Sequence, residues 1–128
     1  MALPRLLVIG HGAVLGGERR ALVPGATLVV GRSRSCQLSL RRCRGFVRSD
    51  DRHGLLASEG FRRVSRVHCE VAYLRDGRVE IRDLSRNGTI VDGRRLSRPL
   101  VIVPGDPGVN VVLADPIHGT LRVEFETQ

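Results

Sequence analysis

Three short segments of the chain carry the side chains whose types and spacing are best suited to binding chemistry. They are Gly31-Arg32, Ser65-Arg66-Val67-His68 and Ser85-Arg86-Asn87-Gly88. The planar guanidinium of an arginine matches phosphate oxygens two at a time, and a serine hydroxyl supplies a further donor. An asparagine amide can donate to and accept from a peptide backbone at once. Since a phosphorylated side chain carries about −1.5 to −2 charges and three strong acceptor oxygens, these residue types suit a phosphorylated peptide.

Short strands are predicted on either side of these segments. Leu121, Val123 and Phe125 alternate with charged residues, and several other stretches show the same period of two, which is typical of half-buried strands. About ten strands are expected, at residues 6–9, 21–23, 27–30, 37–40, 67–74, 78–82, 89–91, 100–103, 111–114 and 121–126. Gly-containing turn pairs separate many of them, and no segment keeps a period of 3.6. The pattern predicts an all-β sandwich.

The order of the motifs resembles that of the forkhead-associated (FHA) domain, a phosphothreonine-binding β-sandwich. The shared pattern is Gly-Arg, then Ser-x-x-His, then Ser-x-Asn-Gly-Thr, and the resemblance spans residues 6–125. It implies a single FHA-like domain over residues 1–128, with about 10–11 mostly antiparallel strands. It also implies a phosphopeptide-binding module without catalysis.

The resemblance implies a phosphopeptide-binding role for five residues. Arg32 and Ser65 match the positions that contact the phosphate, Arg66 a position that often adds a contact, and Asn87 the position that grips the peptide backbone. Arg86 precedes this asparagine and either adds a phosphate contact or extends into solvent. The alternatives from the residues alone are a solvated strand-end arginine at Arg32, ordinary loop residues at Ser65 and Arg66, and a pure hairpin turn at Asn87.

Four further positions follow from the same resemblance. Arg63 matches a position that contacts the third residue after the phosphothreonine, which would favour an acidic residue there; its alternative is a solvent-facing arginine. Gly31, His68 and Gly88 match positions that shape the binding loops. A catalytic role for His68 is disfavoured because no nucleophile or carboxylate has motif spacing to it.

Residues 41–63 have no strand pattern and form a long basic insertion between two predicted strands. Counted from Arg41 to Arg66, the chain holds eight arginines against three acidic residues, a local charge of +5. We expect this insertion to be a mobile arm outside the core, although Phe46, Leu55, Leu56 and Phe61 could dock one short turn. The charge asymmetry indicates an anionic partner at one end of the sandwich.

Composition narrows the function classes. The chain has 128 residues, a net charge of +8 and no lysine among its 21 basic residues, which excludes Schiff-base chemistry and a phosphate-loop nucleotide site. The three cysteines, at positions 36, 43 and 69, lack metal-site or redox spacing and are expected to be buried and reduced. His11, His53 and His118 are expected at the surface. We therefore expect neither a metal nor a cofactor, and no enzyme.

The expected partner is a threonine-phosphorylated protein, which implies a Ser/Thr kinase pathway. No membrane span is predicted, and a cytoplasmic monomer is expected. A basic nucleic-acid-binding β domain is one alternative, but only four aromatic residues are present to fill a core and stack on bases. A degenerate FHA scaffold for protein assembly is the other, and the joint presence of Arg32, Ser65 and Asn87 disfavours it.

Overall fold

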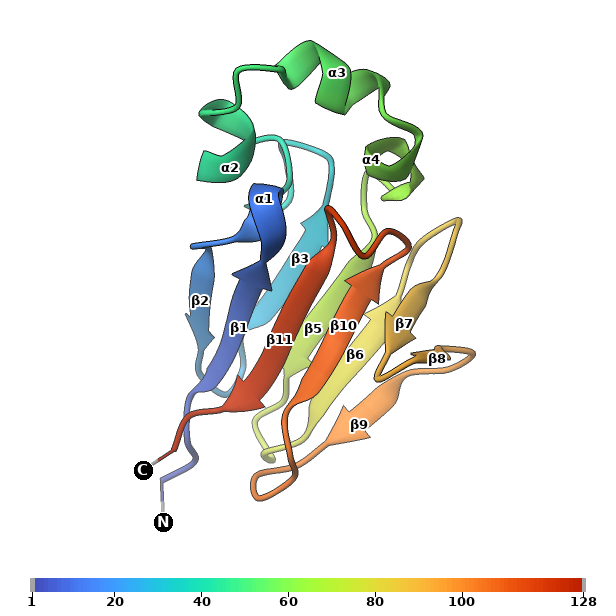
Figure 1. The fold of residues 1–128 in the computed structure, drawn as a ribbon. Helices are drawn as coiled ribbons and strands as arrows, with labels where there is room; N and C mark the ends of the chain where they lie inside the picture. Colours follow the sequence, from blue (N-terminus) through green and yellow to red (C-terminus); the bar gives the residue numbers. More distant parts are fainter. Residues whose placement is uncertain (1, 128) are drawn as a thin grey trace.

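Two β-sheets packed face to face form the body of the protein in the computed structural model, which describes residues 2–127 (Figure 1). In order across the first sheet, its strands are β2 (Arg19–Leu22), β1 (Leu6–His11), β11 (Thr120–Phe125), β10 (Val109–Leu113), β7 (Thr89–Val91) and β8 (Arg94–Arg95). The second sheet is β4 (Leu38–Ser39), β3 (Thr27–Gly31), β5 (Cys69–Tyr73), β6 (Val79–Asp83) and β9 (Leu100–Ile102). The predicted all-β sandwich is confirmed.

The core is built from the alternating apolar residues of both sheets. Leu121 and Val123 of β11 are fully buried, as are Val79 and Ile81 of β6, while their charged neighbours are half-buried or exposed. This is the period-two burial that the sequence predicted. Val67 is an exception: it was predicted to share the buried face of its strand, but it is 41% exposed and lies before β5 begins.

The sheet topology brings several loops to one end of the sandwich. Strands β3 and β4 are parallel, with Val30 beside Leu38, so both end at the same edge. Strand β5 runs antiparallel to β3 and begins at that edge, and β6 runs antiparallel to β5 and ends there. The segments after β3, before β5 and after β6 therefore meet at one end, and the described chain ends lie at the other (Figure 1).

Phe46 and Phe61 anchor the basic insertion in the core, so the prediction that the insertion lies outside the core is wrong. The insertion forms three short helices, α2 (Arg44–Val47), α3 (Arg52–Ala57) and α4 (Glu59–Arg63), which cover the loop end of the sandwich (Figure 1). Phe46 and Phe61 are buried in the main cluster and stack with their ring centroids 5.6 Å apart. The burial of these two rings stabilises the insertion, although many of the residues between them are polar.

Side-chain caps define two of these helices. Asp51 accepts a hydrogen bond from the Gly54 N–H at 3.0 Å and begins α3, and Ser58 accepts one from the Phe61 N–H at 3.5 Å and begins α4. Both are residue types that favour this position. Within residues 2–127 no helix has the length and apolar character that crossing a membrane requires.

The histidine predictions had mixed outcomes. His11 and His53 are exposed as expected, but His118 is half-buried: it contacts the Asp115 carboxylate and packs edge-on against Phe61. The apolar surface of α4 therefore covers a histidine that the sequence left isolated.

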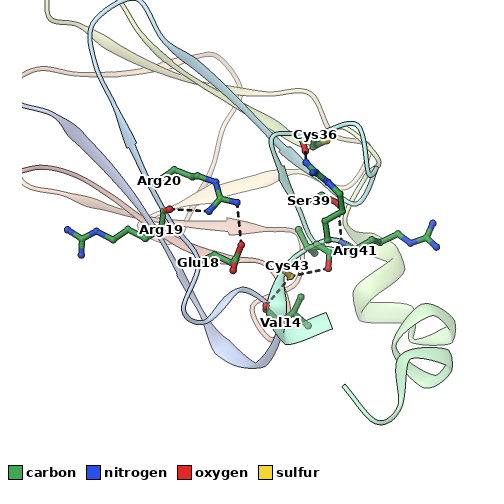
Figure 2. A network of polar contacts seen from close by, with 10 residues as sticks. Val14, Glu18, Arg19, Arg20, Cys36, Ser39, Arg41 and Cys43 are labelled. Atoms are coloured by element: carbon green, nitrogen blue, oxygen red, sulfur yellow. Dashed lines mark hydrogen bonds and ion pairs between the residues drawn. The ribbon is translucent and has the colours of Figure 1, made fainter. Parts of the chain in front are cut away.

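All three cysteines are buried and free, as predicted. The Cys43 sulfur lies 3.1 Å from the carbonyl oxygens of both Val14 and Leu40, which share its single hydrogen (Figure 2). Val14 belongs to α1 (Gly12–Leu15), and Cys43 is the residue before α2, so this thiol ties the start of the insertion to the sandwich.

Candidate functional site

An open groove lies at the loop end of the sandwich. Its lining residues are Arg32, Arg62, Ser65, Arg66, Val67, Leu84, Arg86 and Asn87. All five residues predicted to bind a phosphopeptide are in this set. Arg62 lines the groove in place of Arg63, and the sequence analysis did not single it out. Arg62 lies in the last turn of α4, three residues before Ser65, and no motif in the sequence distinguishes it from Arg63.

Arg32 directly follows strand β3 and lines this groove. Its backbone N–H donates to the Ser65 carbonyl at 3.0 Å, and its Nε donates to the Val64 carbonyl. Burial lowers the pKa of Arg32 below its ordinary value, and the charges of nearby arginines, Arg66 and Arg62 among them, lower it further. Because an arginine stays protonated near neutral pH, this crowding is a repulsion that a bound anion would relieve.

Gly31 allows the approach of the next loop to β3. A Cβ atom at this position would stand 2.2 Å from the Arg66 carbonyl oxygen and 3.0 Å from the His68 nitrogen. No side chain fits at that distance, so the glycine sets how closely the Ser65 loop lies against the strand.

Ser65 connects the two loops that flank the groove. Its hydroxyl oxygen accepts a hydrogen bond from the Arg86 backbone N–H at 2.9 Å, and its own N–H donates to Nδ1 of His68, also at 2.9 Å. The hydroxyl accepts in this contact, so its hydrogen remains available to donate toward the groove.

His68 lies fully buried beneath both loops. Since a backbone N–H only donates, Nδ1 must accept from Ser65, and since a carbonyl only accepts, Nε2–H must donate to the Gly88 carbonyl at 2.8 Å. Burial lowers the pKa of His68, partly opposed by the Gly88 hydrogen bond and the Asp83 charge. The imidazole is therefore a neutral connector with both nitrogens in use.

The β6–β7 turn is organised by Asp83, which the sequence analysis did not select. Its carboxylate accepts from the Ser85 N–H at 3.0 Å, from the Ser85 hydroxyl and from the Thr89 hydroxyl at 2.8 Å. Burial raises the pKa of Asp83, but these hydrogen bonds together outweigh it and lower the net value. The Asp-x-Ser spacing of an Asx turn was the available signal.

Asn87 joins this turn to the end of α4. Its Nδ2 donates to the Arg63 carbonyl at 2.9 Å, which leaves its amide oxygen free for another donor. Gly88 follows with a φ of 101°, a conformation that glycine adopts without strain. The backbone of Arg63 thus supports the groove, although its side chain is not among the lining residues.

The groove presents positive charge without an acidic counterpart. No carboxylate lines it, and no ion pair found within residues 2–127 involves Arg32, Arg62, Arg66 or Arg86. The same part of the chain holds no cluster of three or more His, Cys, Asp or Glu residues placed for a metal. This arrangement of side chains can bind an anion that has several acceptor oxygens.

Comparison with known proteins bears on the same region. The FHA domain family model matches residues 28–107. No curated protein sequence matches the chain. The structure of the FHA domain of CT664 protein from Chlamydia trachomatis is similar, at 25% identity and a TM-score of 0.66, with 97% of this chain and 99% of that one covered.

Two further solved structures share the fold at lower identity. One comes from work on phosphothreonine-dependent FHA domain interactions, with 18% identity, a TM-score of 0.64 and coverage of 97% and 99% of the two chains. The other is the FhaA FHA domain in complex with the intracellular domain of Rv3910, with 19% identity, a TM-score of 0.59 and coverage of 93% and 99%.

Proposed function

The chain belongs to the FHA domain family, and on this basis we propose that it is a non-catalytic module that binds a phosphothreonine-containing segment of a partner protein. Related folds of the family support the proposal: one comes from a study of phosphothreonine-dependent interactions and one is in complex with a partner protein's intracellular domain. A phosphorylated threonine implies a Ser/Thr kinase in the same pathway. The module would act as a cytoplasmic monomer.

The observation that carries the proposal is the groove of four arginines with no acidic residue in its lining. Arg32, Arg66 and Arg86 would donate to the phosphate oxygens, and the Ser65 hydroxyl would add a donor. The free amide oxygen of Asn87 would accept from a backbone N–H of the peptide. Charge-assisted hydrogen bonds of this kind contribute about 1.5–3 kcal/mol each.

Aromatic burial favours a phosphopeptide over a nucleic acid. Phe46, Phe61 and Tyr73 are buried, and Phe125 is half-buried with its ring edge-on to Tyr73 at 5.8 Å. Binding of single strands depends on exposed aromatic faces that stack on bases, and these four rings pack within the protein.

The test is calorimetry with peptides selected from a degenerate library around a fixed phosphothreonine. We expect binding that disappears when the peptide is dephosphorylated. Arg32→Ala and Ser65→Ala should each weaken affinity about tenfold or more, since a lost 1.4 kcal/mol is a factor of ten. Arg75→Ala is the matched control, because Arg75 is exposed in the turn between β5 and β6 at the opposite end.

Two outcomes would contradict the proposal. One is equal binding of phosphorylated and unphosphorylated peptides. The other is a folded Arg32→Ala protein with the affinity of the wild type. Melting temperatures of each variant separate loss of contact from loss of fold.

A further inference from the structure

A second basic groove adjoins the first, and the proposed function uses only the two arginines that the grooves share. It is lined by Arg32, Ser33, Arg34, Arg41 and Arg66. Arg32 and Arg66 line both grooves, so the two are continuous across these side chains. Arg34 and Arg41 belong to the second groove alone, and no carboxylate lines it.

The parallel pairing of β3 and β4 brings Arg41 beside Arg32. Gly31 pairs with Ser39, so the residues that follow the two strands leave the sheet at the same edge. The buried Ser39 hydroxyl donates to the Arg32 carbonyl at 3.5 Å and accepts from the Arg41 N–H at 3.2 Å. Figure 2 shows Ser39 and Arg41 at this edge, close to Cys36. Hydrogen bonds through Ser39 therefore fix the backbone of Arg41 relative to that of Arg32.

Hydrogen bonds also connect the other segments that line the second groove. The Ser33 N–H donates to the Arg66 carbonyl at 3.0 Å, and the Cys36 thiol donates to the same oxygen at 3.2 Å. The Ser33 hydroxyl and the Ser35 hydroxyl lie 2.8 Å apart. The loop that carries Arg34 is therefore tied to the Ser65 loop that carries Arg66.

Arg41 has unused binding capacity at this site. Its Nε atom is buried and has no hydrogen-bond partner within residues 2–127. No ion pair in that range involves Arg34 or Arg41. Arg41 and Arg32 line the same groove, and the charge of Arg41 is one of those that lower the pKa of Arg32. Buried donors in folded proteins normally have partners, so this nitrogen is available to donate to a bound anion.

We propose that the second groove binds a second phosphate group on the same ligand, so that the domain selects a segment with two phosphorylated residues. The proposal rests on the proposed function of the first groove, with which it shares Arg32 and Arg66. A phosphate has three acceptor oxygens and about two negative charges, whereas a carboxylate has two oxygens and one charge. A pocket of four guanidinium groups is better matched by the phosphate.

The experiment uses a peptide with one phosphothreonine that binds the wild-type protein. The peptide is resynthesised with one phosphoserine placed in turn at each position from four before to four after the phosphothreonine. We expect one position, or two adjacent ones, to raise affinity at least tenfold in calorimetry. Aspartate at the same position should give a clearly smaller gain, and phosphoserine at the other positions only the small gain of added charge.

Substitutions then assign the gain to the second groove. Arg41→Gln and Arg34→Gln should each reduce affinity for the doubly phosphorylated peptide about tenfold, and affinity for the singly phosphorylated peptide no more than threefold. Arg48→Gln, an exposed arginine at the end of α2, removes the same charge from the insertion and should retain the gain. Arg34 is exposed, so its variant is informative even if Arg41→Gln is destabilised.

The outcomes separate this inference from the proposed function. If the singly phosphorylated peptide binds but no position of the second phosphate raises affinity tenfold, the second groove is not a phosphate site and the proposed function stands. A gain that aspartate equals, or that survives both Arg34→Gln and Arg41→Gln, also overturns the inference. If no phosphothreonine peptide binds at all, both proposals fail together.

Discussion

Replacing His68 with alanine would remove a buried side chain that connects the two loops of the groove. The imidazole accepts from the Ser65 N–H at 2.9 Å and donates to the Gly88 carbonyl at 2.8 Å. Both backbone groups would lose their partner beneath the loops, where His68 is fully buried and alanine has no polar atom to replace it.

The size of the effect follows from these two groups. A buried donor or acceptor left without a partner costs about 1–3 kcal/mol, so the pair costs about 2–6 kcal/mol before any cavity is counted. Unfolding entropy near 60 °C is about 2.1 cal/mol/K per residue, or about 0.27 kcal/mol/K for 128 residues. We therefore expect the melting temperature to fall by about 7–22 °C and phosphopeptide affinity to fall with it.

Thermal unfolding followed by circular dichroism, together with calorimetry, measures both effects. His68→Gln serves as an intermediate, because an amide can still donate to the Gly88 carbonyl and should retain part of the stability. His53→Ala is the control, since His53 is exposed on α3. A His68→Ala protein with the wild-type melting temperature and no affinity would refute this reasoning and indicate that His68 contacts the ligand directly.

Three other outcomes can be checked on the same protein. Since the pKa of His68 is lowered in the folded protein, the histidine of the unfolded chain is protonated first as the pH falls. The free energy of unfolding should therefore decrease below about pH 6.5, by at most about 1.4 kcal/mol per pH unit. Urea denaturation at several pH values should show this slope, and His68→Gln should reduce it. Phe61→Ala should cost about 3–5 kcal/mol in urea denaturation, because the ring is fully buried against Phe46; an unchanged midpoint would restore the mobile-arm interpretation of the insertion. Two peptides of equal composition, one with aspartate three residues after the phosphothreonine and one with it elsewhere, should differ in affinity if Arg63 contacts that position; Arg63→Ala should then abolish the difference, and equal binding to the wild type would exclude the contact.

The strands and the main groove were predictable because their signals are local. Period-two alternation and short apolar segments between turn signals predicted ten of the strands in residues 2–127 to within a few positions. The short strand Arg94–Arg95 was missed because both of its residues are exposed. The three motifs lie in loops whose ends the sheet brings together. Their order along the chain carried the resemblance to the FHA domain, and that resemblance implied that Arg32, Ser65 and Asn87 share a site.

The insertion and the second groove depend on contacts between residues far apart in the sequence. Phe46 and Phe61 are fifteen positions apart, and neither belongs to a sustained apolar period, so their stacking left no pattern to find. Arg41 reaches Arg32 only through the parallel pairing of β3 with the two-residue strand β4. Hydrogen-bond caps at Asp51 and Ser58 were the available local signals for α3 and α4.

All of the charged side chains that line the two grooves are arginines. A guanidinium does not change charge anywhere in the physiological range, whereas a lysine or histidine in the same place could. The second ionisation of a phosphate monoester falls near pH 6. The binding surface therefore acts as a fixed positive background, and a change in affinity across that pH would report the charge of the phosphate itself.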